Sequence, residues 1–148
     1  MILLDTDHVS VLRMPGGDRR SRLLARLALA ADERIAIPVI AAEETMRGWL
    51  SAIAKERQAR RQVYAYRELG NMFRFFAASE IALFEDLAAD QFDQFSRIRI
   101  GTSDRKIAAI ALVNNALLLT ANRRDYEQIP SLRFENWMDE PPVPPTGT

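Results

Sequence analysis

The chain opens with the stretch Ile2-Leu3-Leu4-Asp5-Thr6-Asp7, in which a short apolar run leads directly into two carboxylates. An apolar run of this length predicts a buried strand. A carboxylate at its carboxyl end is unexpected in a core, because burying an unpaired charge is very unfavourable. In open α/β sheets, however, that edge is where ligands bind. The stretch therefore predicts a functional site at the end of the first strand, with Asp5 at its centre.

Strand and helix patterns alternate along the rest of the chain, which predicts a parallel sheet with right-handed crossovers. Strands are expected at residues 2–4, 34–37, 80–84, 117–120 and 133–135. Helices are expected at residues 9–12, 20–31, 39–55, 57–77, 85–96, 104–115 and 126–128. Pro38 fits the first turn of the third helix, where its missing N–H costs nothing. The fully apolar strands 2–4 and 117–120 are expected at the centre of the sheet, and the core residues expected in helix 85–96 are Leu87, Phe92 and Phe95.

The composition is that of one ordinary globular domain. The chain has 148 residues, of which 48% are hydrophobic and 27% are charged, so it can bury a sizeable core. No apolar stretch approaches the ~18 residues of a membrane span, and the first apolar run is too short for a signal peptide. We therefore expect a cytoplasmic protein without a membrane partner. A domain is expected over residues 1–138, followed by a proline-rich, flexible tail over 139–148.

The side chains available restrict the metals that this chain can bind. It has no cysteine and a single histidine, which excludes thiolate sites and a multi-histidine zinc site within one chain. Any metal must then be held mainly by oxygen, which favours Mg²⁺ or Mn²⁺. The 20 basic and 20 acidic residues cancel, so the net charge does not by itself indicate nucleic acid as a partner.

Acidic residues recur where the predicted topology meets the carboxyl edge of the sheet. Asp5 ends the first strand, and Glu44 lies early in the helix after the second. Asp104 opens the helix before strand 117–120, and Asp125 lies in the loop after that strand. Alone, Asp104 and Asp125 are also explained as helix caps or turn residues. Plain exposure explains Glu44, and helical periodicity does not choose it over Glu43.

Taken together, these four acids predict a cation site. Two carboxylates about 4 Å apart repel by ~4 kcal/mol at an effective dielectric near 20. A cluster of them needs protonation or a cation, and hard divalent cations bind well to oxygen. Such a cation can activate water against a phosphodiester. Neutral side chains that would orient water or substrate phosphate accompany the acids: Thr6, Ser103, Thr120 and Asn122.

In order along the chain, these residues resemble the motifs of the PIN-domain ribonucleases, specifically the VapC-type toxins of bacterial toxin–antitoxin pairs. The first motif is similar to Leu3-Leu4-Asp5-Thr6-Asp7, where the family often has Asn at the position of Asp7. The second matches Pro38 through Glu44 and Gly48, and its spacing selects Glu44 over Glu43. The third matches Gly101 through Ala109 around Asp104, and the fourth matches Thr120, Asn122, Asp125 and Tyr126, where Phe is usual in place of Tyr126.

The resemblance implies a three-layer α/β/α fold with a central parallel sheet and a homodimer. It also implies cleavage of RNA that depends on Mg²⁺ or Mn²⁺, and inhibition by a cognate VapB-type antitoxin. By the same resemblance, Asp5, Glu44, Asp104 and Asp125 are both the catalytic residues and the metal ligands. Asp7 is a supporting residue or an additional ligand.

Two other functions fit parts of the sequence. Asp5-Thr6-Asp7 also resembles the start of the haloacid-dehalogenase-type phosphatases, but those enzymes need a downstream lysine, and Lys55 and Lys106 do not have the required setting. A non-catalytic RNA-binding module is the second alternative. The acids speak against it, because they repel phosphate unless a cation lies between them.

Three further features have open interpretations. His8 is expected to be a local hydrogen-bonding residue, with a catalytic base as the alternative. The basic stretch Arg57–Arg67 is either a solvated helix face or a contact for RNA phosphate or antitoxin. Its aromatic residues are expected to pack in the core or a dimer interface rather than stack on bases: Tyr64, Tyr66 and Phe73.

Overall fold

The computed structural model describes residues 1–141 and 143–147, and its centre is a parallel sheet of five strands. The strands are β1 (Ile2–Leu4), β2 (Ile35–Pro38), β3 (Ile81–Ala82), β4 (Leu117–Leu119) and β5 (Arg133–Glu135). Their order in the sheet is β3-β2-β1-β4-β5. The apolar strand β1 is therefore central, as predicted, and pairs with β2 on one side and β4 on the other.

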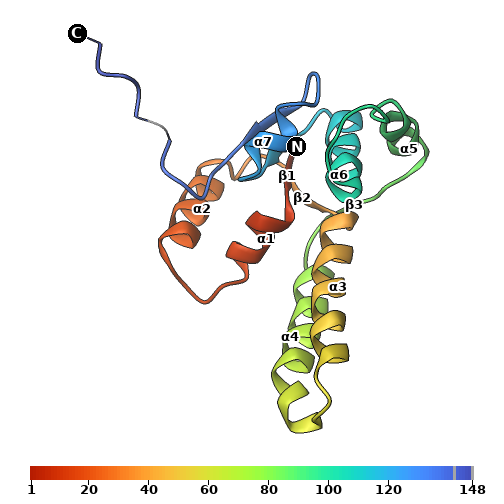
Figure 1. The fold of residues 1–148 in the computed structure, drawn as a ribbon. Coiled ribbons are helices and arrows are strands. Elements are labelled where there is room, and N and C mark those ends of the chain that lie inside the picture. The colour runs from red at the N-terminus through yellow and green to blue at the C-terminus, as the bar shows by residue number, and fades with distance from the viewer. Residues whose placement is uncertain (142, 148) are drawn as a thin grey trace.

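Helices cover both faces of this sheet, so the predicted three-layer α/β/α architecture is confirmed (Figure 1). The helices are α1 (Thr6–Leu12), α2 (Asp18–Leu29), α3 (Val39–Lys55), α4 (Ala59–Ala77), α5 (Asp86–Asp93), α6 (Thr102–Val113) and α7 (Arg123–Tyr126). Side chains alternate across β1. Ile2 and Leu4 join the core cluster that contains residues of α1 and α2, whereas Leu3 joins the cluster around α6.

Helix α6 forms the centre of the second core cluster. Its residues Ile107–Ala111 are all fully buried, so the buried surface is wider than the single apolar stripe of a surface helix. Three of them are alanines, whose small side chains let neighbouring elements approach the helix closely from several sides. This burial holds the first turn of α6, which carries Asp104, rigidly at the edge of the sheet.

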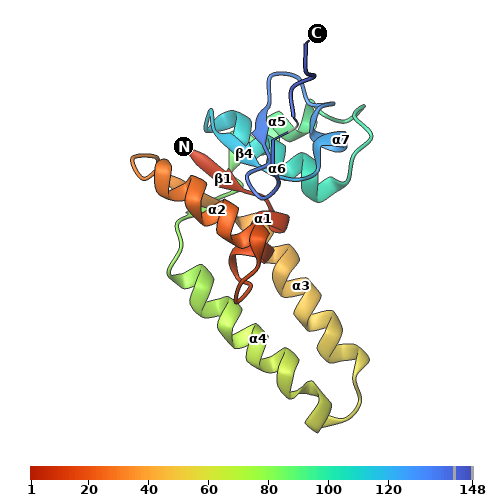
Figure 2. The same cartoon turned by 90° about the vertical axis from the view of Figure 1, so that its left-hand side faces the viewer.

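Helices α3 and α4 form an arm that extends away from the body of the molecule (Figures 1 and 2). Only the first turn of α3 is buried in the body, through Ile40 and Ala41. At the tip of the arm the side-chain amide of Gln62 donates to the carbonyl oxygens of Ile53 and Glu56, at 3.0 and 2.8 Å. These bonds satisfy carbonyl groups that the end of α3 leaves without helical partners.

Several predicted boundaries were wrong. Helix α1 begins at Thr6 rather than at Val9, because the Asp5 carboxylate accepts from the Thr6 amide at 2.8 Å and starts the helix directly after the strand. Helix α7 spans Arg123–Tyr126, so Asp125 lies inside a helix and not in a loop. Pro38 is the last residue of β2 rather than part of the first turn of α3.

Leu87 is not a core residue, since 72% of its surface is exposed. It lies in the first turn of α5, and the neighbouring Ala88 takes the buried position. Phe95 is buried and Phe92 packs against the same core cluster, as expected.

The first residues of the predicted tail, which spans residues 139–148, contact the body of the molecule. Asp139 pairs with Arg19, and Glu140 lies 3.6 Å from Arg22. Two residues of the predicted flexible tail, 142 and 148, lie outside the described residues, and the division at 138/139 stays a prediction. In the described part of the chain, no helix combines the length and the hydropathy that crossing a bilayer requires.

Candidate functional site

The predicted acidic residues lie at the carboxyl edge of the sheet, around the ends of β1 and β4. These two neighbouring strands mark the point from which the strand order runs in opposite directions, and ligands of open α/β sheets bind at such points. The backbone amide of Asp5 donates to the Leu119 carbonyl at 2.9 Å. That bond extends the β1–β4 pairing by one residue and places the Asp5 side chain beside Thr120.

Asp5 is a nearly buried carboxylate with two donors. It is 5% exposed. One oxygen accepts from the Thr6 amide at 2.8 Å and the other from the Thr120 hydroxyl at 2.7 Å. Burial, followed by the charge of Asp7, raises the pKa of Asp5 from 3.8 to about 7, although both hydrogen bonds favour the charged form.

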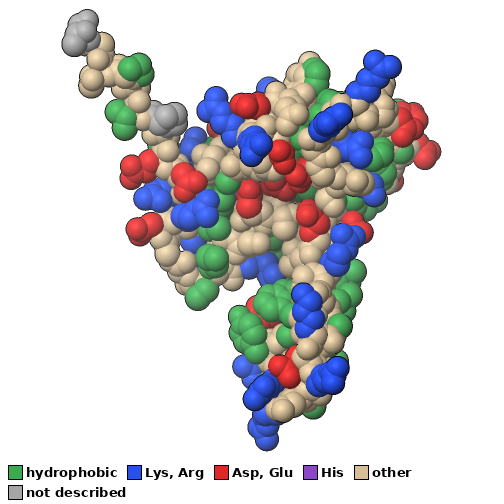
Figure 3. Space-filling model, viewed as in Figure 1, with side chains coloured by type: hydrophobic (Ala, Val, Ile, Leu, Met, Phe, Trp, Pro, Cys, Tyr) green, Lys and Arg blue, Asp and Glu red, His purple; other side chains and the backbone are tan. Residues whose placement is uncertain are grey.

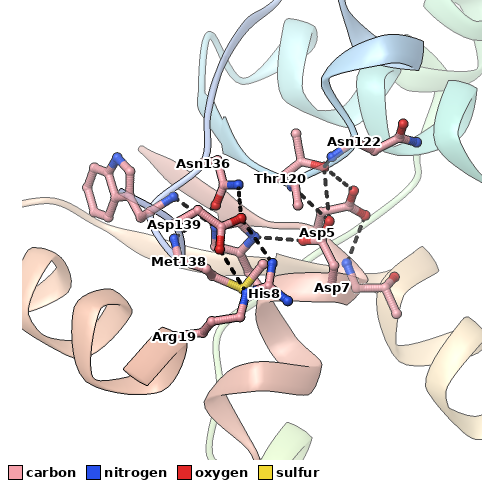
Figure 4. Close-up of polar contacts among 12 residues, drawn as sticks. Asp5, Asp7, His8, Arg19, Thr120, Asn122, Asn136, Met138 and Asp139 are labelled. Carbon is pink, nitrogen blue, oxygen red and sulfur yellow. Dashed lines mark hydrogen bonds and ion pairs between the residues drawn. The ribbon is translucent and has the colours of Figure 1, made fainter. Parts of the chain in front are cut away.

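Asp7 lies in the first turn of α1 and joins this helix to the loop after β4 (Figure 4). Its carboxylate accepts from the Ala121 amide at 2.8 Å and from His8 Nδ1 at 2.6 Å. The Thr120 hydroxyl lies 3.4 Å from the same carboxylate. Burial alone raises the pKa of Asp7, but the hydrogen bonds from His8 and Ala121 outweigh it and hold that pKa below its ordinary value.

Glu44 is connected to the site by Thr6, whose hydroxyl donates to the Glu44 carboxylate at 2.7 Å. The neighbouring Glu43 instead pairs on the surface with Arg47, one helical turn later, at 2.7 Å. Tertiary structure therefore separates the two adjacent acids that helical periodicity left equivalent.

Asp104 and Asp125 are linked by Asn122. The side-chain amide of Asn122 donates to Asp104 at 3.3 Å and to Asp125 at 3.0 Å. The Tyr126 hydroxyl donates to Asp104 at 3.2 Å. Burial is the largest influence on Asp104 and raises its pKa. The charges of Glu44, Asp125 and Asp7 raise it further, against the hydrogen bond from Tyr126. The charges of Glu44 and Asp125 therefore act together on Asp104.

The oxygen atoms of the acids in this site are suitable ligands for a hard divalent cation. All the acids offer oxygen, and within residues 1–141 and 143–147 no ion pair of 4.0 Å or less involves Asp5, Glu44, Asp104 or Asp125. In the same residues no three acidic or histidine side chains form a ready metal-binding group. Mg²⁺ does not need such a group, since it keeps several waters and usually takes one or two carboxylates directly.

Of the predicted supporting residues, Thr6, Thr120 and Asn122 each bridge acidic side chains. Ser103 lies in the first turn of α6 beside Asp104, and no side-chain hydrogen bond connects it to the acids in the described structure. Sequence reasoning missed the Tyr126 hydroxyl, which is buried against Asp104. The available signal was a polar aromatic residue at the motif position where Phe is usual in the family that the sequence resembles.

A groove of about 960 Å³ leads from this site along the inner side of the arm. Thr6 and Glu44 line it at the site, and Trp49, Tyr64 and Phe75 supply much of its apolar wall. Figure 3 shows the molecule hollowed between the body and the arm. Of the two positions predicted for Tyr64, Tyr66 and Phe73, the core is excluded, because all three are more than half exposed, and the dimer interface stays a prediction.

Comparison with known proteins identifies relatives of this fold. The family model described as PIN domain matches residues 2–132. The DNA-bound VapBC from Salmonella typhimurium is 24% identical, with a TM-score of 0.69 over 92% of this chain and 97% of that one. VapBC2 from Rickettsia felis, bound to a DNA fragment from its promoter, is 25% identical, with a TM-score of 0.67 over 93% of this chain and 99% of that one.

VapBC-1 from nontypeable Haemophilus influenzae is 20% identical, with a TM-score of 0.70 over 94% of this chain and all of that one. The comparison with curated proteins finds no match. The structural likenesses therefore extend over almost the whole chain at low sequence identity.

We predict that Asp5→Asn stabilises the metal-free protein above neutral pH. The folded-state pKa of Asp5, about 7, lies above its ordinary value of 3.8, so the folded protein binds the proton more tightly than the unfolded chain does. Stability then falls as pH rises from about 4 to 7, by up to about 4 kcal/mol from this group. The Asn variant lacks this loss, and urea unfolding in EDTA at pH 5 and pH 8 measures the difference.

Asp90→Asn, an exposed acid on α5, is the control for removing one negative charge. A variant at Asp5 that is less stable than the parent at pH 8 would show that its carboxylate stabilises the fold.

Proposed function

The chain belongs to the PIN domain family, and from this premise we propose that it is a metal-dependent endoribonuclease, the toxin of a VapBC-type toxin–antitoxin pair acting in the cytoplasm. The observation that carries the proposal is the set of acids at the sheet edge. Asp5, Glu44, Asp104 and Asp125 come from four elements or element ends. Neutral donors connect them, and no basic side chain neutralises them among the described residues.

In this proposal Asp5 and Asp104 bind Mg²⁺ or Mn²⁺ directly, while Glu44 and Asp125 bind it directly or through water. The bound cation supplies positive charge for the phosphodiester in its transition state and lowers the pKa of a water nucleophile. The chain's own residues prepare the site. The Thr120 hydroxyl orients Asp5, and the Asn122 amide holds Asp104 and Asp125 in a common orientation.

A VapB-type antitoxin is the proposed protein partner, and a homodimer the proposed assembly. The similar solved structures named above are VapBC complexes. The groove beside the arm supports the partner proposal, since it presents aromatic side chains along its length and ends at the Glu44 side of the acids. An antitoxin segment in this groove would cover the acidic cleft.

RNA is the proposed substrate, and the tip of the arm supports this. Lys55, Arg57, Arg60 and Arg61 are exposed there, and none of them takes part in an ion pair of 4.0 Å or less among the described residues. Figure 3 shows basic side chains gathered at the far end of the arm, away from the acidic side chains of the body. Free positive charge of this kind attracts phosphate and makes binding depend on salt.

The phosphatase alternative lacks its lysine. Lys106 lies over the Phe84 ring, with its ammonium 5.8 Å from the ring centroid, and Lys55 is the last residue of α3, on the arm. Asp7 would be the general acid of such an enzyme, but its carboxylate already accepts hydrogen bonds from His8 and from the Ala121 amide.

We expect the purified protein to cleave RNA with Mg²⁺ or Mn²⁺ and to lose this activity in EDTA. Asp5→Asn and Asp104→Asn should lower the rate by a factor on the order of 10³, the usual cost of removing one electrostatic contact in a transition state. Cleavage of a mixed RNA panel measures this, with Asp90→Asn as the control. Cleavage that persists in EDTA would contradict the metal requirement.

Glu43 and Glu44 form a matched pair for testing the site. Glu44→Gln should lower cleavage by roughly 10²-fold or more, because Glu44 faces the site through Thr6. Glu43→Gln should leave the rate within about twofold, because Glu43 pairs with Arg47 on the surface and surface pairs contribute little. Equal losses in both variants would remove Glu44 from the proposed site.

The double variant Arg60→Gln/Arg61→Gln should weaken RNA binding and its dependence on salt. Removing two phosphate contacts should reduce the slope of log Kd against log salt by about 1.4 for single-stranded RNA. Fluorescence anisotropy with the Asp104→Asn protein at several salt concentrations measures that slope. The control is the double variant Arg34→Gln/Arg133→Gln, which removes the same charge at the amino edge of the sheet. An equal change of slope in the two double variants would show that the tip of the arm holds no RNA.

A further inference from the structure

His8 connects the acidic site to the C-terminal segment, which we define as residues Asn136–Asp139. It lies in α1 and is fully buried, with 0% exposure. Its Nδ1 lies 2.6 Å from an Asp7 oxygen, and its Nε2 accepts from the Trp137 amide at 3.2 Å (Figure 4). One imidazole thus contacts an acid of the site with one nitrogen and a backbone amide 129 residues away with the other.

These two contacts determine where the imidazole carries its proton. A backbone N–H can only donate, so Nε2 must present its lone pair to the Trp137 amide. The proton of the neutral ring then lies on Nδ1 and points at Asp7, whose carboxylate is an acceptor. His8 is therefore held as a fixed donor to Asp7, and the Trp137 amide selects this tautomer.

Asp7 in turn holds the loop that carries two site residues. It accepts from the Ala121 amide at 2.8 Å. The hydroxyl of the preceding residue, Thr120, donates to Asp5 at 2.7 Å and accepts from the backbone amide of Asn122 at 3.0 Å. The orientation of Asp7 therefore decides where Thr120 and Asn122 stand relative to the acids that they bridge.

The C-terminal segment has its own attachments, so it can act as a fixed reference. Trp137 and Met138 are buried in the core cluster around α1 and α2, at 7% and 0% exposure. The Asn136 side chain accepts from the Met138 amide at 2.9 Å and donates to Asp139 at 2.7 Å. Arg19 of α2 donates to both Asp139 oxygens, at 3.0 and 3.2 Å. These contacts hold the Trp137 amide in place, and none of them involves Asp5, Glu44, Asp104 or Asp125.

We propose that His8 is a positioning residue of the nuclease: its Nδ1–H bond holds Asp7 against the Ala121 amide and so fixes Thr120 and Asn122 beside Asp5 and Asp104. The inference rests on the proposed function for its effect on cleavage, and on the hydrogen-bond chain alone for its structural part. The C-terminal segment also contributes to the site, because the bond from the Trp137 amide selects the His8 tautomer that donates to Asp7.

Two amide substitutions separate the contacts of His8. The amide nitrogen of His8→Asn stands near the place of Nδ1 and keeps a donor for Asp7, but loses the acceptor for Trp137. The amide oxygen of His8→Gln reaches the place of Nε2 and keeps that acceptor, but loses the donor. We expect His8→Gln to lower kcat by about 10–100-fold, the range for partners that orient ligands, with KM unchanged. His8→Asn should stay within about threefold of the parent.

Thermal unfolding of both variants controls for stability, and rates are compared at a temperature where both are folded. Equal losses of kcat in the two variants, or retention by His8→Gln, would overturn the proposal. Rescue by the Asn side chain is the result that a merely structural histidine does not produce.

Nitrogen NMR tests the inference without using cleavage. His8 is the single histidine of the chain, so protein labelled with ¹⁵N-histidine gives one pair of ring signals. We expect the neutral Nδ1–H tautomer, and we expect the Ala121 amide signal to move in His8→Gln more than in His8→Asn. The Nε2–H tautomer, or an unmoved Ala121 amide, would overturn the positioning role. If the parent protein cleaves no RNA, the proposed function fails while these signals still decide the tautomer and the contact.

Discussion

A carboxylate that is almost out of contact with water, at the end of the central strand, is the constraint on which this structure depends. Asp5 is 5% exposed, and burial together with neighbouring negative charge disfavours its ionised form. Such a group is tolerated only where donors compensate it. The first amide of α1 and the Thr120 hydroxyl are those donors. The start of α1 and the end of β4 must therefore meet at this one position.

The other acids are held by the same principle, with a neutral donor between neighbouring carboxylates. Thr6 stands beside Glu44, Asn122 spans Asp104 and Asp125, and Tyr126 supports Asp104. These donors reduce the repulsion locally, but they add no positive charge. The edge of the sheet therefore keeps an excess of negative charge that a divalent cation would neutralise, and this excess makes the site costly for the metal-free fold.

The rest of the molecule keeps this unfavourable arrangement in place. The fully buried run Ile107–Ala111 anchors the helix that carries Asp104. The C-terminal segment, packed on α2 and bonded to His8, anchors the side of the site that carries Asp7. The arm has a different part, because only its base is buried in the body. It extends the site outward as a groove with aromatic walls and a basic tip, a surface suited to macromolecular partners.

Short-range pattern was enough to predict the architecture. The alternation of apolar runs and helical patterns predicted the parallel sheet, and the bounds of Ile2–Leu4, Val39–Lys55 and Arg133–Glu135 agree with the structure. Composition indicated that any metal is held mainly by oxygen ligands, and an acid after an apolar strand indicated Asp5. The motif spacing selected Glu44 over Glu43, but only the tertiary structure showed how Glu44 reaches the site, and that Tyr126 and His8 belong to its network. Those contacts are hydrogen bonds between residues that lie 22 to 129 positions apart in the sequence. No local periodicity encodes them, because the groups meet only after the sheet has brought its strand ends together.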